Sequence, residues 1–314
     1  MDRLDAMKVF VTALDEGSLA AAGRRLRHSP AAVTRAIAAL ETHVGTRLLH
    51  RTTRAIKLTE AGERYLETCR RVLAELDEAS MQAAGERGAP RGLLTLTAPL
   101  AAGARLFRPV VDDFLTTQPA VQARLLLLDR TVNIVDEGID VALRIAHLPD
   151  SSLIAVRVGE VRRVVCASPA YLKSKGPISS PADLAQHDII ALGDTTQNST
   201  WSFPAGPGSK RLRKIKLNPR LFINTVEGAI GSAVEGHGVT RALSYQVQHD
   251  VRAGRLTLLL REFEPPPLPV HLIVPAGRTA VAKVRAFMDF AVPRLKAAFA
   301  ERAGSDRARK RSQP

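Results

Sequence analysis

The sequence predicts a multi-domain protein of the α/β class, with a helical head, one long helix and a larger α/β region. Three observations predict this order. Residues 1–59 show helical spacing of apolar residues and then two short extended runs. Residues 60–86 continue as one helix whose apolar positions lie three or four apart. From residue 91 onward strands alternate with helices, which is typical of an α/β fold with a mostly parallel sheet.

The head is predicted to hold three helices and a β-hairpin. Helices are expected over residues 4–14 and 19–27. A third helix follows a short break, with Ser29 as its cap and Pro30 at its first position, where a missing N–H costs nothing. Residues 47–58 form two extended runs around a polar tip. This order is the winged helix-turn-helix plan, whose second motif helix enters the major groove of DNA.

The charge distribution indicates a polyanionic partner for the head. The chain has 314 residues and a formal net charge of +14. A general excess of arginine in the source proteome would also give this net charge. The distribution of the charge along the chain therefore has to distinguish that alternative from a polyanionic partner. Residues 24–57 carry eight Lys and Arg against one acid, Glu41. Since Lys and Arg gain affinity by releasing counterions from phosphates, we expect the head to bind nucleic acid.

The long helix is predicted to connect the head to the rest of the chain. Residues 60–86 would form a rod of roughly 40 Å at about 1.5 Å per residue. Its narrow apolar seam favours a coiled coil between two copies of the chain, and packing on its own domain is the alternative. Residues 85–92 have the composition of a linker.

Several classes of protein are excluded by what the sequence lacks. Cys69 and Cys166 are isolated, so neither a disulfide scaffold nor a zinc site is expected. We expect no cofactor, no metal and no catalytic residue, because no Gly-x-Ser-x-Gly, Walker, His-Glu-x-x-His or Cys-x-x-Cys motif occurs. The first residues do not resemble a signal peptide, and no apolar run approaches the ~18 residues of a membrane span. We therefore expect a cytoplasmic, nucleoid-associated protein that contacts no membrane.

The head resembles the LysR-type transcriptional regulators. The matching residues are Ser18–Leu26, Ser29–Ile37, Leu40–Glu41, Gly45, Leu48–Leu49, Arg51 and Leu58–Gly62. The resemblance covers residues 3–88 without gaps and implies a sequence-specific DNA-binding regulator that responds to a small-molecule effector. It further implies a homodimer or homotetramer on promoter DNA, and contact with RNA polymerase for an activator. Two positions depart from the family: Gly23 replaces the usual Ala, and Pro30-Ala31 replaces a more polar pair.

The resemblance places the DNA contacts on the third helix and on the hairpin tip. Residues expected to contact DNA are Ser29, Ala31, Thr34, Arg35, Arg51, Thr53 and Arg54. Thr34 and Arg35 are the expected base readers, because arginine pairs with guanine and a threonine methyl meets thymine. The tip residues would contact the backbone or the minor groove. For each arginine, a phosphate contact is the alternative to a base contact.

The resemblance also implies a periplasmic-binding-protein-like effector domain of two α/β subdomains. The implied boundaries are 1–59 for the head, 60–90 for the linker helix and hinge, 91–160 with 268–300 and 161–267 for the subdomains, and 301–314 for a basic, disordered tail. Strands are expected at 93–97, 121–128, 141–144, 163–167, 239–242, 256–260 and 271–274, and helices at 103–117, 225–236, 244–252 and 279–299. The chain is expected to cross between subdomains near 158–161 and to return near 265–269.

Ligands in open α/β sheets sit at the carboxyl ends of strands and at helix N-termini. Effector contacts are therefore expected at Ala98, Pro99, Leu100, Thr131, Ile145, His147 and Thr225. Ordinary capping or packing is the alternative at each position. A carboxylate-bearing ligand is one candidate, and Arg144 would face that anion or form a salt bridge between the subdomains. The basic run Lys210–Lys216 is expected to be a solvated strand face, with DNA contact as the alternative.

Three other functions compete with DNA-binding regulation. An enzyme lacks its motifs here, as stated above. A metal-responsive regulator would need paired His, Cys or Asp ligands, and the eight His are scattered. A solute-binding protein of a transport system would need a signal peptide and no DNA-binding head. The sequence names neither the effector nor the target genes.

Overall fold

The computed structural model describes residues 2–50, 56–83, 89–148, 153–193, 200–206, 208–209 and 211–311. The chain forms two compact units. The first holds residues 1–92 together with 281–283, and the second holds residues 93–280 and 284–314.

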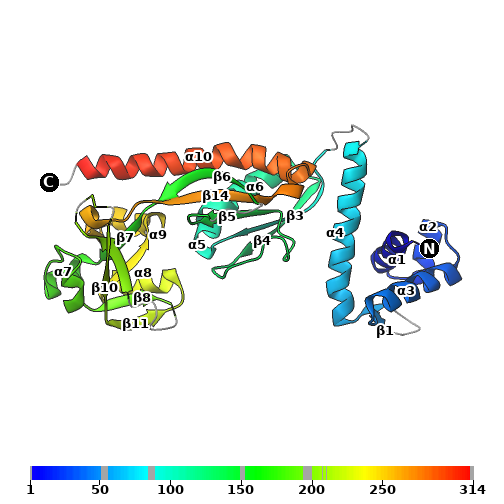
Figure 1. The fold of residues 1–314 in the computed structure, drawn as a ribbon, viewed down its shortest axis with the longest axis horizontal. Helices are drawn as coiled ribbons and strands as arrows, with labels where there is room; N and C mark the ends of the chain where they lie inside the picture. The colour runs from blue at the N-terminus through cyan, green and yellow to red at the C-terminus, as the bar shows by residue number, and fades with distance from the viewer. Residues whose placement is uncertain are drawn as a thin grey trace. The chain divides into compact units, whose positions relative to one another are not determined.

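The first unit contains four helices and a two-stranded sheet within the described residues (Figure 1). The elements are α1 (Arg3–Asp15), α2 (Leu19–Leu26), α3 (Pro30–Val44), β1 (Leu49–His50), β2 (Lys57–Leu58) and α4 (Glu60–Ala83). The two strands pair antiparallel, with Leu49 opposite Leu58. The predicted order of three helices, a hairpin and a long helix is confirmed.

Local hydrogen bonds define the break between α2 and α3. Ser18 accepts from the N–H of Ala21 at 3.4 Å, and Ser29 accepts from the N–H of Ala32 at 3.2 Å. Arg27 ends α2 in the left-handed region with φ of 55°. Glycine at position 23 has a structural reason, because a Cβ there would lie 2.9 Å from the carbonyl oxygen of His28. The break can therefore approach α2 closely.

The core of the first unit is shared by the helices and the start of α4. Phe10, Val33 and Leu40 are buried there, and Leu66 and Cys69 of α4 join the same cluster. Leu76, further along α4, is 41% exposed. The first half of α4 thus packs on its own domain, which was the alternative expectation. Its second half leaves the apolar side chain of Leu76 uncovered, and the expected coiled coil between two copies stays a prediction.

The first sheet of the second unit has the order β4-β3-β5-β14-β6. Its strands are β3 (Gly92–Ala98), β4 (Val121–Leu127), β5 (Val141–Ile145), β6 (Leu153–Val161) and β14 (Leu268–Pro275). Strand β3 pairs parallel to β5, whereas β14 pairs antiparallel to β5 and β6. Helix α6 (Arg108–Thr117) packs on α10 (Ala282–Arg311) through Phe114 and Phe287, whose rings are 5.1 Å apart.

The second sheet has the order β11-β8-β12-β7-β13. Strands β9 and β10 form a two-stranded sheet of their own. The strands are β7 (Arg163–Ala167), β8 (Ile189–Leu192), β9 (Thr200–Pro204), β10 (Leu212–Lys216), β11 (Pro219–Ile223), β12 (Val239–Leu243) and β13 (Thr257–Leu259). The helices are α7 (Pro169–Lys175), α8 (Val226–Val234) and α9 (Ser244–Arg252). The chain enters through β6 and β7 and returns before β14, near both expected crossings.

The sheets are mixed, so the expectation of a mostly parallel sheet is wrong. Strand β12 pairs parallel to β8 but antiparallel to β7, and β13 also pairs antiparallel to β7. The physical reason is the double crossing: β7 and β14 each enter their sheet from the other subdomain and not from a β-α-β crossover. The basic strand β10 is exposed at four of its five residues, as a solvated strand face should be.

Two helices extend beyond their expected ends. The helix expected at 103–117 begins at Leu100 as α5 (Leu100–Ala102) and passes through a π-helical stretch, Gly103–Phe107, before α6. Helix α10 continues to Arg311, where a disordered tail from residue 301 was expected. Residues 301–311 are rich in Ala, Arg, Glu and Lys, which are strong helix formers, so the charge of this segment did not prevent a helix.

Among the helices described, none combines the length and apolar character that crossing a bilayer requires. The described side chains also form no group of three or more His, Cys, Asp or Glu that would hold a metal ion.

Replacing Gly62 by alanine should destabilise the first unit. A Cβ at Gly62 would lie 2.0 Å from the carbonyl oxygen of Leu48, which is backbone and cannot rotate away. We expect a loss of about 1–3 kcal/mol from overpacking, against a gain of about 1 kcal/mol in helix propensity. Thermal unfolding of the full-length chain, followed by circular dichroism, measures the difference.

Gly231→Ala is the matched control, because Gly231 also lies inside a helix and has no atom within 4 Å of a built Cβ. It should be neutral or stabilising. An unchanged or raised Tm in Gly62→Ala would show that the close contact with Leu48 is not required.

Candidate nucleic-acid interface and ligand site

Helix α3 separates a buried face from an exposed face. Val33, Ala36, Ile37 and Leu40 are buried in the core. The predicted contact residues Ser29, Ala31, Thr34 and Arg35 are all exposed. Because residues three and four apart share a side of a helix, Ala31, Thr34 and Arg35 form one surface at the N-terminal end of α3, next to Ser29 at the cap. Their contact with DNA stays a prediction at this point.

The two predicted base readers differ in what they offer. The hydroxyl of Thr34 donates to the carbonyl of Pro30 at 3.0 Å. Its proton is therefore occupied, and its methyl group and remaining lone pairs are what it presents outward. Arg35 is exposed, and no ion pair holds it within the described part of the chain. Its five N–H donors are thus available to a partner.

Further cations surround α3, and one of them is already engaged. Arg24, Arg27 and Arg47 are exposed. The Nη1 of Arg25 lies 2.5 Å from Glu16, and this hydrogen bond raises the pKa of the guanidinium. The positive charge that remains around α3 is of the kind that attracts phosphates.

The wing of the motif is held by one carboxylate that the sequence analysis did not identify. Oε1 of Glu41 accepts from the backbone N–H groups of Leu48 and Leu49, at 2.8 and 3.1 Å. Thr59 adds a second tie, since its hydroxyl donates to the carbonyl of Arg47 at 2.7 Å. Glu41 was visible as the lone acid in a basic stretch, and that contrast was the available signal.

The predicted tip residues Arg51, Thr53 and Arg54 lie outside the described residues. Their roles therefore stay predictions. The strands on either side, β1 and β2, are described and fixed by the contacts of Glu41 and Thr59.

In the second unit, the segment after β3 is well ordered by hydrogen bonds. Ala98 is fully buried and Pro99 half-buried, while Leu100 is 39% exposed. The N–H of Leu100 donates to Oδ1 of Asp129 at 2.9 Å. This helix start therefore already has one carboxylate partner.

The other predicted ligand contacts vary in exposure. Thr131 and His147 are exposed and Ile145 is half-buried. Thr131 does not lie at a helix start as expected, because residues 131–133 are irregular and a turn follows. Thr225 is exposed and caps α8, accepting from the N–H of Gly228 at 3.4 Å.

Tyr245 brings together groups from the two sheets. Burial raises the pKa of Tyr245 to about 12, while its hydrogen bond with Gln246 lowers it. Asp129, Arg105 and Glu227 also act on this phenol through their charges. Arg105 lies next to the first sheet, and its Nη1 donates to the carbonyl of Gln246 in α9 at 2.7 Å. Arg105 thus connects the two subdomains through α9 beside Tyr245, a residue that the sequence analysis missed.

Arg144 is half-buried. Its Nη2 is buried and has no hydrogen-bond partner among the described residues. Burial lowers the pKa of this guanidinium, and the charge of Glu137 opposes the effect. His271 lies directly opposite on β14, and its Nδ1 is buried without a partner in the same described set. Of the two alternatives for Arg144, the salt bridge between subdomains is not found among the described residues, and contact with an anion stays a prediction.

Two protein-family models match the chain. The model described as the LysR substrate binding domain matches residues 87–296. The model described as the bacterial regulatory helix-turn-helix protein of the lysR family matches residues 4–63.

Similar curated proteins carry regulator names. An HTH-type transcriptional regulator of Xanthomonas campestris is 33% identical, over 91% of this chain and 84% of its own length. An HTH-type transcriptional repressor of Pseudomonas aeruginosa is 32% identical, over 92% of this chain and 91% of its own length. Such relatives are transcriptional regulators.

Similar solved structures cover nearly the whole chain. CrgA of Neisseria meningitidis, described as a LysR-type transcriptional regulator, has a TM-score of 0.59 and 27% identity, covering 93% of this chain and 98% of its own. The full-length virulence activator AphB of Vibrio cholerae also has a TM-score of 0.59, with 26% identity, covering 93% and 99%.

Removing the carboxylate of Glu41 should loosen the wing. Glu41→Ala would leave the N–H groups of Leu48 and Leu49 without their acceptor. We expect a loss of about 1.5–3 kcal/mol, the range for hydrogen bonds to a charged group. Hydrogen exchange of residues 46–50 and thermal unfolding of the full-length chain measure it.

Glu60→Ala is the control, because Glu60 is exposed and its ion pair among the described residues is with Arg64 on the surface. It should change stability by less than about 0.5 kcal/mol. If the amide hydrogens of residues 46–50 exchange as slowly in Glu41→Ala and Glu60→Ala as in the unaltered chain, Glu41 does not hold the wing.

Proposed function

This chain belongs to the LysR family of bacterial transcription regulators, and we propose how its parts divide that function. Helix α3 reads base edges in the major groove of promoter DNA. The second unit binds a small-molecule effector between its two sheets and thereby changes DNA binding or activity. The chain carries out no enzymatic reaction and works in the cytoplasm, on the nucleoid.

The observation that carries the proposal is the exposed N-terminal surface of α3. A recognition helix must offer uncommitted donors on the side away from its core. Arg35 has such donors and reads guanine through its O6 and N7 atoms. Thr34, whose proton is used by Pro30, contacts a thymine methyl with its own methyl group. Ala31 leaves room for the close approach of a base pair.

The remaining head residues position the helix on the DNA backbone. Ser29 caps α3 and lies at the helix N-terminus, where phosphates are favoured by the free N–H groups. The wing residues Arg51, Thr53 and Arg54 contact phosphates or the minor groove beside the site. The ties from Glu41 and Thr59 set the direction in which the wing leaves the domain.

The effector site proposed for the second unit uses residues from both sheets. The residues are Ala98, Pro99, Leu100, Thr131, Ile145, His147 and Thr225, and we add Tyr245, a buried phenol that accepts a hydrogen bond from Gln246. A hydrogen bond from Arg105 to the carbonyl of Gln246 already links the helices of the two subdomains, so a ligand beside them would change an existing contact. This gives effector binding a route to the arrangement of the sheets.

We propose that the regulator acts as a homodimer or homotetramer, joined by the outer half of α4. Leu76 is exposed there on a helix with an apolar seam, and burial of such a seam drives helix pairing. A dimer reads an inverted repeat with half-sites about one helical turn apart. If the protein activates transcription, RNA polymerase is a further partner.

Arg35 should set the sequence preference of the protein, and Arg54 should not. Binding sites are first selected from a random duplex library with the full-length protein. Arg35→Ala should then lose about 1–3 kcal/mol of discrimination against single-base changes, because a bidentate base contact is removed. Arg54→Ala should weaken binding to every duplex alike, because a phosphate contact carries no sequence information. Fluorescence anisotropy measures both, and affinity should fall steeply with salt.

Arg285→Ala serves as the control for lost positive charge, since Arg285 is exposed on α10 and far from α3 in the sequence. It should leave affinity and discrimination unchanged. Equal losses on all sequences for Arg35→Ala and Arg54→Ala would contradict the assignment of Arg35 to base reading.

A further inference from the structure

The two-stranded sheet β9–β10 lies in a stretch of chain whose positive charge is not compensated by acidic residues of the same stretch. Residues 195–226 contain six Lys and Arg and no Asp or Glu. A surface that only keeps a protein soluble usually mixes both signs of charge. The exposure of β10 fits the expected solvated face and equally its alternative, contact with DNA, so the arrangement of the side chains has to distinguish the two.

One face of β9–β10 anchors the two strands to the second sheet. Trp201 and Phe203 of β9 are buried in the apolar cluster of that sheet, and Ile215 of β10 packs against the cluster. Ile215 lies directly opposite Trp201. Because the strands are held by this packing, a partner that binds to their other face has little conformational freedom to remove.

The opposite face of β9–β10, which we call the outer face, presents Thr200, Ser202, Lys214 and Lys216. Successive side chains of a strand point to opposite faces, and Lys214 lies opposite Ser202 and Lys216 opposite Thr200. Both lysines are exposed, and no ion pair holds either of them within the described part of the chain. Two residues apart on one strand, they are separated by about 6.6 Å. Each ammonium group can therefore meet a separate phosphate of one DNA strand.

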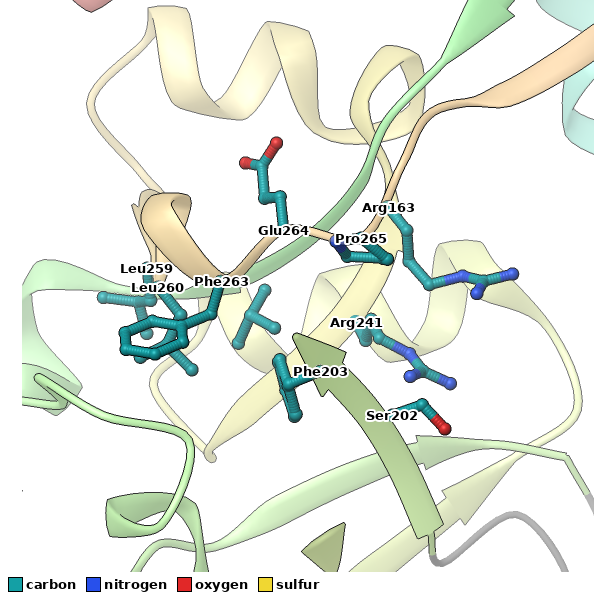
Figure 2. Close-up of a pocket in the computed structure, with 10 residues that line it drawn as sticks. Arg163, Ser202, Phe203, Arg241, Leu259, Leu260, Phe263, Glu264 and Pro265 are labelled. Atoms are coloured by element: carbon teal, nitrogen blue, oxygen red, sulfur yellow. The ribbon is translucent and has the colours of Figure 1, made fainter. Parts of the chain in front are cut away.

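Two arginines of the second sheet add positive charge on the same side (Figure 2). Arg163 of β7 and Arg241 of β12 lie on one face of the sheet, because Arg241 pairs with the residue two positions after Arg163. Figure 2 shows both guanidinium groups pointing away from Phe263 and in the same direction as the Ser202 hydroxyl. The Arg241 guanidinium lies over the ring of Trp201, 4.9 Å from its centroid.

The charges of these two arginines are not neutralised by an acidic partner in the described part of the chain. Glu264 lies in the same region, but Arg162 holds its carboxylate at 2.7 and 2.8 Å. Burial, and to a lesser extent the charge of Arg163, lowers the pKa of Arg241 to about 10. Both guanidinium groups therefore stay charged at neutral pH and add to the positive potential beside the outer face.

Duplex DNA is the polyanion that this surface fits. The chain belongs to a family of DNA-binding regulators, so a duplex is present whenever the protein works. Single-stranded nucleic acid is usually bound by stacking its bases on aromatic side chains. The described residues of the outer face include no aromatic side chain, and their ammonium and hydroxyl groups are donors suited to phosphate oxygens.

We propose that the outer face of β9–β10 contacts the phosphate backbone of duplex DNA through Lys214 and Lys216, with Thr200 and Ser202 donating from their hydroxyl groups. The contact carries no sequence information and adds affinity by releasing counterions. This inference rests on the proposed function, because the head is what brings the chain to its DNA site. A rearrangement of the second unit would then act on the DNA at this contact as well as through the head.

The test measures how binding of the full-length protein to DNA depends on salt. Fluorescence anisotropy is recorded with a selected duplex and with a scrambled duplex of the same length. In Lys214→Gln/Lys216→Gln two phosphate contacts are lost, so the slope of log K against log salt should become shallower by about 1.8. Between about 50 and 200 mM salt, the affinity of the unaltered chain should therefore fall about tenfold more than that of the variant. The preference for the selected duplex should not change.

Lys173→Gln/Lys296→Gln is the matched control, because both lysines are exposed in the second unit and lie outside β9–β10. It removes the same charge and should keep the salt slope of the unaltered chain. Thermal unfolding should give the same Tm for both double variants, since all four side chains are exposed.

A cross-link tests the contact directly. Cys69 and Cys166 are both buried, so a cysteine introduced on the surface can be labelled selectively with an azidophenacyl photo-cross-linker. Labelled Lys214→Cys should cross-link to the selected duplex, and labelled Lys173→Cys should not. Equal cross-linking from both positions, or none from Lys214→Cys, would overturn the inference.

The two duplexes separate this inference from the proposed function. A normal preference for the selected duplex, with equal slopes for Lys214→Gln/Lys216→Gln and the unaltered chain, would contradict the backbone contact alone and assign the outer face to an acidic protein. Equal binding of both duplexes by the unaltered chain, with a shallower slope in the variant, would contradict base reading by α3 and leave the backbone contact standing.

Discussion

In the first unit, the contacts of one residue, Leu48, fix the positions of α3, the wing and α4. Its N–H donates to Glu41 of α3, and its carbonyl accepts from the N–H of Thr59 at the start of α4 at 3.0 Å. Its side chain is fully buried in the core. Gly62 lets α4 approach this carbonyl more closely than any other residue would. The recognition helix, the wing and the long helix are therefore placed by contacts made at a single position.

This constraint links the DNA-reading surface to the connecting helix. A shift of α4 would move the carbonyl of Leu48, and through Leu48 the carboxylate of Glu41 on α3. Because both hydrogen bonds use the backbone of Leu48 and one of them is to a part-buried carboxylate, a lost partner is costly and the three elements are expected to move together. The geometry around Leu48 is thus a physical path from the linker to α3.

Much of the fold could be predicted where the signal is local. Helix α9 was expected at 244–252 and is found at Ser244–Arg252, and the cap at Ser29 was correct. Strands β6, β8, β9 and β11 were missed, because short or irregular apolar runs do not identify a strand by periodicity alone. The direction of strands was not predictable either, since it depends on which sheet the chain enters after each crossing. Tyr245 was missed because Arg105, which donates to the carbonyl of the adjacent Gln246, is distant in sequence and meets α9 only in the folded chain.

Arg27 has a consequence for how this head can be improved or evolve. It is a non-glycine residue with φ of 55°, a conformation that costs a side-chain-bearing residue about 1–2 kcal/mol. Glycine would adopt it without strain, yet would remove a cation next to the recognition helix. At position 27, glycine would therefore favour thermal stability, whereas arginine favours attraction to DNA. A laboratory selection for heat resistance alone should replace this arginine early, and one that also demands tight operator binding should retain it.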